Sequence, residues 1–179
     1  MKIFIPVLIL LCSLQLRAQS DPFHAGSAIV DFGKIATVHD MEPLPKNVSF
    51  KVAFDVAKAA EPGQINRSID SVARFINMHV AAGVPIENLD LAIVIHGGST
   101  KEMTDNDFYQ KNKATEPVNA NITLIKALQA KGVNFYVCGQ SAAYHGVKTS
   151  DLLPGVKMSL SAMTAHALLQ QQGYTVNPF

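Results

Sequence analysis

The sequence predicts an α/β fold, in which a mostly parallel sheet carries helices on both faces. Three observations support this prediction. Short apolar segments alternate with amphipathic ones from residue 50 onward, the run Leu89–Ile95 is almost entirely apolar, and glycine or proline follows most segments. Strand–helix alternation implies right-handed crossovers between parallel strands, and a strand that is apolar throughout is typical of a sheet buried on both faces. We therefore expect one α/β domain over residues 48–179.

The first three elements of this domain follow from their periodicity. Phe50–Val56 places a large apolar residue at every second position, which predicts a strand. Residues 64–82 place apolar side chains at helical spacing, and Gly83 followed by Pro85 is a common helix stop. Leu89–Ile95 then predicts the next strand.

The remaining elements repeat the alternation at shorter length. Gly132 suits the end of one helix, and Ser161 suits the N-cap of another. The predicted elements are a helix over 119–131, a strand over 133–138, a short helix over 142–145, a strand over 156–160, a helix over 161–172 and a strand over 174–176.

Residues 1–18 predict a secretory signal peptide. Met1 and Lys2 supply a positive start, residues 3–16 are almost all apolar, and Ala18 is a small residue at the expected cleavage point. The apolar run is shorter than the roughly 20 residues that a membrane-spanning helix needs, although an uncleaved anchor is an alternative. We expect an exported protein, periplasmic or extracellular, with no stable membrane insertion after cleavage.

Residues 19–47 are predicted to form an arm ahead of the domain. Pro43 and Pro45 stop regular structure just before the first predicted strand. The arm packs either on the domain itself or on a neighbouring subunit, and the sequence is compatible with both.

Charge and cysteine content narrow the classes of function. Loss of the signal peptide removes Lys2 and Arg17, so basic residues fall from 15 to 13 against 14 acidic ones and the net charge moves from +1 to −1. A nearly neutral chain gives no reason to expect nucleic acid or an anionic membrane as a partner. Cleavage also removes Cys12 and leaves Cys138 as the single cysteine, which indicates either intermolecular pairing or a free reactive thiol.

A candidate site lies where two predicted strands end. His96 follows one strand and Cys138 ends another, and parallel sheets bind ligands beyond the carboxyl ends of their strands. Glycines after both residues allow close backbone approach and leave amide N–H groups to face an anion. A helix N-terminus after Cys138 favours its thiolate, and a thiolate beside an imidazole is an arrangement for nucleophilic chemistry. The predicted catalytic residues are Cys138 and His96, and the predicted ligand-binding residues are Gly97, Gly98, Gly139, Gln140, Ser141 and Asp55.

Several of these residues also have a structural interpretation. Cys138 could be a small buried apolar residue, and His96 could cap its loop. Asp55 could orient His96, or it could be a solvated carboxylate at a strand end. Weaker candidates are Tyr109, Lys111, His145 and His166. The first two are expected at the surface, and the last is expected to be packed or exposed in its helix. No pair of the six histidines has metal-ligand spacing, so we expect no metal and no cofactor.

A set of motifs resembles the DsrE/DsrF-like family, which has the YchN-like fold, and within it a branch with signal peptides. The motifs are the strand Phe50–Val56, Ile-Val-Ile-His-Gly-Gly at 93–98, Val-Cys-Gly-Gln-Ser at 137–141, Asp-Leu-Leu-Pro-Gly-Val at 151–156 and Gly-Tyr at 173–174. The resemblance implies a three-layer α/β/α sandwich and a homo-oligomer, either a trimer or a hexamer. It also implies sulfur relay, in which a cysteine carries a persulfide, and Cys138 is the residue that could take this role.

Two main functional hypotheses follow. In the first, Cys138 handles sulfane sulfur or redox chemistry near His96, and it exchanges sulfur with a donor or acceptor protein. Any activity would then be sulfur transfer by a persulfide carrier rather than turnover by a hydrolase. In the second, the protein is a non-catalytic oligomeric binding module for a small anionic ligand or a partner protein, and the thiol is incidental. A mainly structural oligomer is a further alternative.

Overall fold

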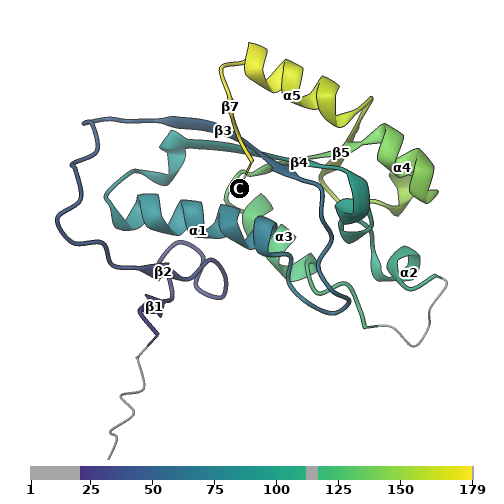
Figure 1. The fold of residues 1–179 in the computed structure, drawn as a ribbon, viewed down its shortest axis with the longest axis horizontal. Helices are drawn as coiled ribbons and strands as arrows, with labels where there is room; N and C mark the ends of the chain where they lie inside the picture. Colours follow the sequence, from purple (N-terminus) through teal and green to yellow (C-terminus); the bar gives the residue numbers. More distant parts are fainter. Residues whose placement is uncertain (1–20, 112–116, 179) are drawn as a thin grey trace, which may run out of the picture.

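The fold is a five-stranded parallel sheet between two layers of helices (Figure 1). The computed structural model describes residues 21–111 and 117–178, and the predicted signal peptide lies outside this part of the chain. The strands are ordered β6-β5-β4-β3-β7 across the sheet. Helices α1 and α3 lie on one face and α5 lies on the other (Figure 1). The prediction of a three-layer α/β/α sandwich is confirmed.

The elements of the domain agree closely with the predicted order. The strands of the sheet are β3 (Phe50–Val56), β4 (Leu89–Ile95), β5 (Asn134–Cys138), β6 (Val156–Ser159) and β7 (Thr175–Asn177). The helices are α1 (Arg67–Ala81), α2 (Asn106–Tyr109), α3 (Ile122–Gln129), α4 (Gly139–His145) and α5 (Ala162–Gln171), and the 3-10 turns are η1 (Ile86–Asn88), η2 (Gly97–Met103) and η3 (Thr149–Asp151). The elements η2 and α2 lie in a polar segment in which the periodicity predicts no helix.

Two helices begin later than the periodicity predicts, because polar side chains shape the chain before them. Asn66 is the N-cap of α1, and its side chain accepts a hydrogen bond from the Ser68 N–H at 3.0 Å. The buried Asn119 donates through Nδ2 to the carbonyls of Glu102 and Thr104, at 2.8 and 3.0 Å. It therefore shapes the turn before α3 and does not form its first residue.

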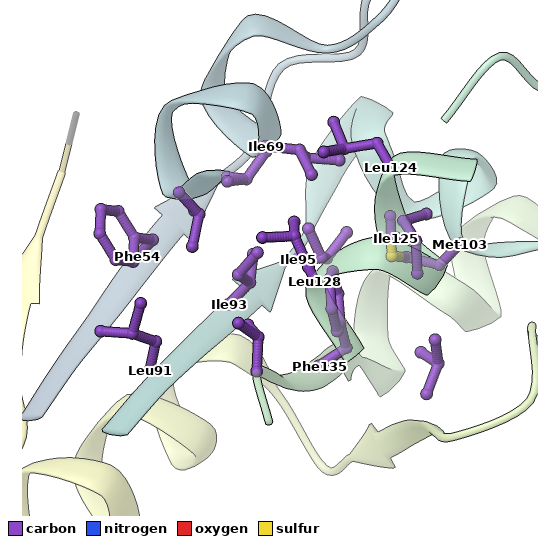
Figure 2. Packing of buried hydrophobic residues seen from close by; sticks show 14 of the residues in the cluster. Phe54, Ile69, Leu91, Ile93, Ile95, Met103, Leu124, Ile125, Leu128 and Phe135 are labelled. Carbon is purple, nitrogen blue, oxygen red and sulfur yellow. The ribbon is translucent and has the colours of Figure 1, made fainter. Parts of the chain in front are cut away.

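The larger core lies between the sheet and helices α1 and α3 (Figure 2). Its sheet side includes Phe54, Ile93 and Phe135, which are 2 % exposed or less. The helices add Ile69 from α1 and Leu128 from α3, both fully buried. Burial of each such side chain stabilises the fold by ~1.5–3 kcal/mol, so this layer fixes the positions of the three central strands.

The arm ahead of the domain packs on α1 of the same chain. Its strands β1 (Phe23–His24) and β2 (Ile35–Ala36) form an antiparallel pair. Between them the chain wraps around the buried Asn77, whose Oδ1 accepts from the Ile29 N–H and whose Nδ2 donates to three carbonyls of residues 29–33, all at 2.9–3.0 Å. Because both polar groups of this buried amide have hydrogen-bond partners in the arm, Asn77 anchors the arm to α1. Of the two positions that the sequence allows, the structure therefore shows packing on the protein's own domain.

A buried carboxylate fixes the connection between β3 and α1 beside the end of β4. Glu102 in η2 is 2 % exposed, and its carboxylate accepts from the Ala60 N–H at 2.7 Å and from Asn66 Nδ2 at 2.6 Å. Burial raises the pKa of Glu102, although these two donors oppose the shift. The connection is thereby held against the turn that follows His96.

The face that carries α5 has a smaller core. Ala53, Ala92 and Val94 of the sheet pack with Ala165 and Leu169 of α5. Small sheet residues let the helix approach closely but bury less apolar surface. Within residues 21–111 and 117–178, no helix has the length and apolar character needed to cross a membrane.

Candidate functional site

The carboxyl ends of β3, β4 and β5 bring three chemically capable residues to the α5 face of the sheet. The parallel register of β4 and β5 ends with Ile95 opposite Val137, and the next residues on these neighbouring strands are His96 and Cys138. The preceding pair lies in the larger core, and side chains alternate along a strand, so His96 and Cys138 point to the opposite face. Asp55 points the same way, because the residues on either side of it in β3 belong to the larger core.

Asp55 is held between two histidines. Its carboxylate lies 3.1 Å from Nε2 of His96 and 2.7 Å from Nε2 of His166, which comes from α5. Burial raises the pKa of Asp55, but the hydrogen bonds and positive charge of the two histidines outweigh it and bring the pKa below its ordinary value. An ionised carboxylate only accepts, so each imidazole carries a proton on Nε2. Of the two roles open to Asp55, the geometry favours orientation of His96.

Cys138 lies beneath the first turns of two helices and is 6 % exposed. The N–H groups of Gln140 and Ser141 in α4 and of Ala162 in α5 hydrogen-bond to its sulfur, together with the Ser141 hydroxyl. Burial raises the pKa of Cys138, but these donors outweigh burial, and the pKa lies below the ordinary value of a thiol. An inert cysteine in apolar surroundings has a raised pKa, so the environment of Cys138 differs from that of an inert cysteine.

The turn from β5 into α4 depends on a glycine. A Cβ at Gly139 would lie 2.6 Å from the Ser159 carbonyl oxygen, so a side chain here would push the turn away from the end of β6. Cys138 pairs with Ser159 in the register of β5 and β6, and α5 begins shortly after β6 at Ala162. The close approach therefore brings the N-terminus of α5 to the sulfur.

Ser141 connects the two loops of the site. Its Oγ accepts from the Gly97 N–H at 2.9 Å, which leaves the hydroxyl proton for the sulfur of Cys138. The Gly97 carbonyl accepts from Nε2 of His145 at 3.0 Å. Both polar backbone groups of Gly97 thus make hydrogen bonds within the protein. The sequence predicts that the N–H of Gly97 faces an anion, but in the structure this N–H donates to Ser141.

An open hollow of about 390 Å³ adjoins the donors to the thiol. It is lined by Gly97, Gly98, Gln140, Ser141, Tyr144 and His145. The Gln140 side chain donates through Nε2 to the Leu160 carbonyl at 3.2 Å, so it braces α4 against the start of α5. A larger hollow of about 530 Å³ lies along residues 58–61 and 64–68. Neither hollow is lined by Cys138 or His96, but the smaller one is lined by Gln140 and Ser141, which follow Cys138 in the turn from β5 into α4. We therefore place the site at the smaller hollow.

His166 is only a weaker candidate in the sequence, but the structure places it in the site. Packing or exposure is the simpler interpretation of a histidine inside the last helix, yet it contacts Asp55. The signal is its spacing, because it follows Ala162 by one helical turn and therefore lies on the same face of α5. Of the other weak candidates, Lys111 places its Nζ 5.6 Å from the centroid of the Phe108 ring.

The site combines a thiol of lowered pKa with an imidazole–carboxylate pair on the neighbouring strands. Among the residues that the structure describes, no group of three or more histidine, cysteine, aspartate or glutamate side chains is arranged to hold a metal ion. The polar atoms of Asp55 and the two histidines are instead directed at each other. A thiolate attacks electrophilic sulfur or carbon, and a nearby imidazole can give or accept the proton that such a step requires.

Fold and site together define a parallel α/β/α protein with a buried cysteine, whose pKa is lowered by nearby donors, at the carboxyl rim of its sheet. The model of the DsrE/DsrF-like family matches residues 51–178, and the chain belongs to this family. The resemblance noted from the motifs is thereby confirmed. No curated protein matches the chain.

Solved structures that are similar to this chain include the following two. The protein of unknown function MTH1491 from Methanobacterium thermoautotrophicum has a TM-score of 0.51 at 17 % identity, over 73 % of this chain and 100 % of that one. The ychN protein from E. coli has a TM-score of 0.48 at 20 % identity, over 73 % of this chain and 99 % of that one. At this identity, the similarity to MTH1491 shows the shared fold alone.

Proposed function

We propose that this protein accepts sulfane sulfur on Cys138 and passes it on as a persulfide. The observation that carries the proposal is the convergence of donors from Gln140, Ser141 and Ala162 on one buried sulfur. The thiolate is the reactive form of cysteine. Membership of the DsrE/DsrF-like family supports sulfur relay as the use of this thiolate.

The transfer is a displacement at sulfur. The Cys138 thiolate attacks the outer sulfur of a donor persulfide R–S–SH, and the new S–S bond forms as the donor's S–S bond breaks. Cys138 then carries –S–SH, and the donor leaves as RS⁻, which takes up a proton. In the second step an acceptor thiolate attacks the outer sulfur, and Cys138 leaves as its stabilised thiolate. A low pKa favours this departure, and the two steps together need no oxidant.

The direct test is the alkylation rate of Cys138 in the folded protein as a function of pH. We expect the rate to rise with a midpoint below the free-thiol value of about 8.5, and we expect Cys138→Ser to be unreactive. Intact mass after exposure to polysulfide should show one added sulfur on the wild type and none on Cys138→Ser. A thiol that alkylates only after denaturation would contradict the proposal.

Exposed apolar side chains near the thiol favour a second candidate function, an oligomeric binding module. Leu160 is 71 % exposed, Met163 80 % and Tyr144 86 %, and apolar surface of this kind marks contact sites. A second copy of the chain would cover them in the homo-oligomer that the resemblance implies. Sedimentation should then show an oligomer that Met163→Glu dissociates, whereas the control Met78→Glu on α1 leaves it intact. A wild type that sediments as a monomer would rule out this assembly.

Export is the third part of the proposal, and it rests on the pattern of residues 1–18. The test is the intact mass of the protein expressed with its own N-terminus in a secreting cell. We expect a mature chain that begins at Gln19. Recovery of the uncleaved chain from the membrane fraction would support an anchor instead.

A further inference from the structure

We propose that His96 supplies the proton that the departing sulfur takes up, and that Asp55 and His166 hold His96 in position for this step. The inference rests on the proposed sulfur transfer at Cys138 and names the groups that act around it. The observation behind this inference is that helix α5 contacts both Cys138 and Asp55. The Ala162 N–H reaches the sulfur, and one turn later His166 reaches the carboxylate of Asp55. Since β4 lies between β5 and β3, His96 stands on the strand between the thiol and the carboxylate.

His96 can exchange a proton through one of its two nitrogens. Its Nε2 lies 3.1 and 3.2 Å from the two oxygens of Asp55, and the carboxylate holds a proton there. Within the described chain, the hydrogen bonds of this side chain all use Nε2, so Nδ1 is the atom that gives or takes a proton. The side chain is 31 % exposed, so a substrate can reach the ring.

His166 is a positioning residue that acts through Asp55. Its Nε2 donates to Oδ1 at 2.7 Å, and its side chain is 16 % exposed. Its Nδ1 is buried and has no partner in the described part of the chain. Asp55 is thus the one polar partner of the His166 side chain in the described part of the chain. His166 therefore fixes the carboxylate, and the fixed carboxylate sets the ring orientation of His96.

His96 gives up a proton in the first step of the transfer and recovers one in the second. In the first step the donor's S–S bond breaks, its electron pair stays on the departing sulfur, and the Nδ1 proton moves to that sulfur. The donor leaves as RSH, and His96 becomes neutral. In the second step the acceptor thiol gives its proton to Nδ1 as its sulfur attacks the persulfide. The imidazole thus acts first as an acid and then as a base, and it returns to its starting state.

The test compares two neutral disulfides that differ in their need for a proton. 4,4′-Dithiodipyridine releases a thiopyridone, which leaves without a proton from the protein, whereas bis(2-hydroxyethyl) disulfide releases an alkyl thiolate, a poorer leaving group. Mixed-disulfide formation on Cys138 is followed by mass spectrometry at fixed pH. With the alkyl disulfide, we expect the rate to fall roughly 100-fold in His96→Gln and roughly tenfold in Asp55→Asn and His166→Leu. With the pyridyl disulfide, we expect changes below about threefold, because no acid is needed.

Two further histidine variants separate positioning from folding. His166→Gln keeps an N–H that can reach Asp55, so it should recover much of the rate with the alkyl disulfide. His39→Gln changes an exposed histidine of the arm and should match the wild type with both probes. If His166→Leu does not fold, Asp55→Asn and His166→Gln carry the comparison. The proposal then requires a selective loss with the alkyl disulfide in Asp55→Asn and retention in His166→Gln.

The outcomes keep this inference apart from the proposed function. A Cys138 that does not alkylate in the folded protein removes the sulfur-transfer proposal itself. A Cys138 that alkylates readily, while His96→Gln slows both disulfides equally or neither, overturns only the role of His96. Loss of the alkyl-disulfide rate in His96→Gln with full retention in both Asp55→Asn and His166→Leu overturns the positioning role of the other two residues.

Discussion

On the face covered by α1 and α3, the sheet buries large side chains such as Phe54 and Phe135 almost completely (Figure 2). On the α5 face, in contrast, the sheet packs alanines in the middle, and its carboxyl end carries Asp55, His96 and Cys138. The same strands build both faces from alternate residues. One step along a strand therefore separates a residue that stabilises the fold from a residue that can do chemistry. Stability and reactivity can then be changed almost independently, provided that each substitution stays on its own face.

The α5 face is itself divided into two polar ends. Near the amino ends of the strands, the Tyr174 hydroxyl donates to Asp90, and Lys51 lies 3.4 Å from the same carboxylate. Near the carboxyl ends, α5 contacts Cys138 and Asp55. Polar contacts thus hold the helix at its first turn and the chain just after its last turn, in addition to the small core. The polar contacts near the amino ends of the strands have a structural role, whereas those near the carboxyl ends belong to the candidate site.

The largest expected effect comes from breaking the larger core. Phe135→Ala removes a fully buried ring from β5 (Figure 2), and we expect it to lower the free energy of unfolding by ~3–5 kcal/mol. Denaturant unfolding measures this loss. The control Phe23→Ala removes the same ring at a position that is 43 % exposed, and it should cost less than about 0.5 kcal/mol. In the protein that remains folded, the pH midpoint of Cys138 alkylation should not move, and a clear shift would show that the faces are coupled.

A smaller loss is expected at the amino end of the α5 face. Burial and the neighbouring Asp90 carboxylate raise the pKa of Tyr174, so its hydroxyl stays protonated and donates. Tyr174→Phe removes this bond to a charged partner and should lower the free energy of unfolding by ~1–2 kcal/mol. Tyr144→Phe, at a side chain that is 86 % exposed, is the matched control and should be neutral. Alkylation of Cys138 should be unchanged in Tyr174→Phe, and slower alkylation would mean that α5 transmits changes between its ends.

At the site itself, the expected effect is on reactivity more than on stability. Ser141→Ala removes the hydroxyl that donates to Cys138, so the pKa of the thiol should rise. We expect the alkylation rate at neutral pH to fall roughly fivefold, which corresponds to one hydrogen bond. Ser71→Ala, which removes an exposed hydroxyl from α1, should leave the rate unchanged. An unchanged rate in Ser141→Ala would assign the stabilisation of the thiolate to the backbone N–H groups alone.

The division between the faces also marks what could be predicted from the sequence. The side-chain pattern of two strands, Phe50–Val56 and Leu89–Ile95, determines which residues point into the cores on either face of the sheet. Both strands have these bounds in the structure. The positions of His96 and Cys138 follow from the ends of two neighbouring strands. The contact between His166 and Asp55 could not be predicted in this way, because it depends on the path of α5 across the sheet. That path is set by packing between residues distant in the sequence.

Glycine positions show a similar limit. The sequence predicts close backbone approach at Gly139 and Gly97, and the structure shows it at both. The approaching groups, however, are the carbonyls of Ser159 and Ala57 rather than a ligand. The absence of a Cβ indicates that something comes close, and only the fold determines which atoms do so.

The smallest expected effect is on the pH dependence of stability. Measuring this dependence compares the α5 face of the sheet with the face that carries the larger core. The folded protein holds the pKa of Cys138 below its unfolded value, so between the two values the unfolded state binds more protons. The free energy of unfolding of the wild type, relative to Cys138→Ser, should therefore rise as the pH rises through this window and should be constant below it. Substitutions in the larger core, such as Phe135→Ala, should shift stability equally at every pH. If the difference between wild type and Cys138→Ser instead falls as the pH rises, burial outweighs the donors, and Cys138 is a packing residue like its neighbour Val137.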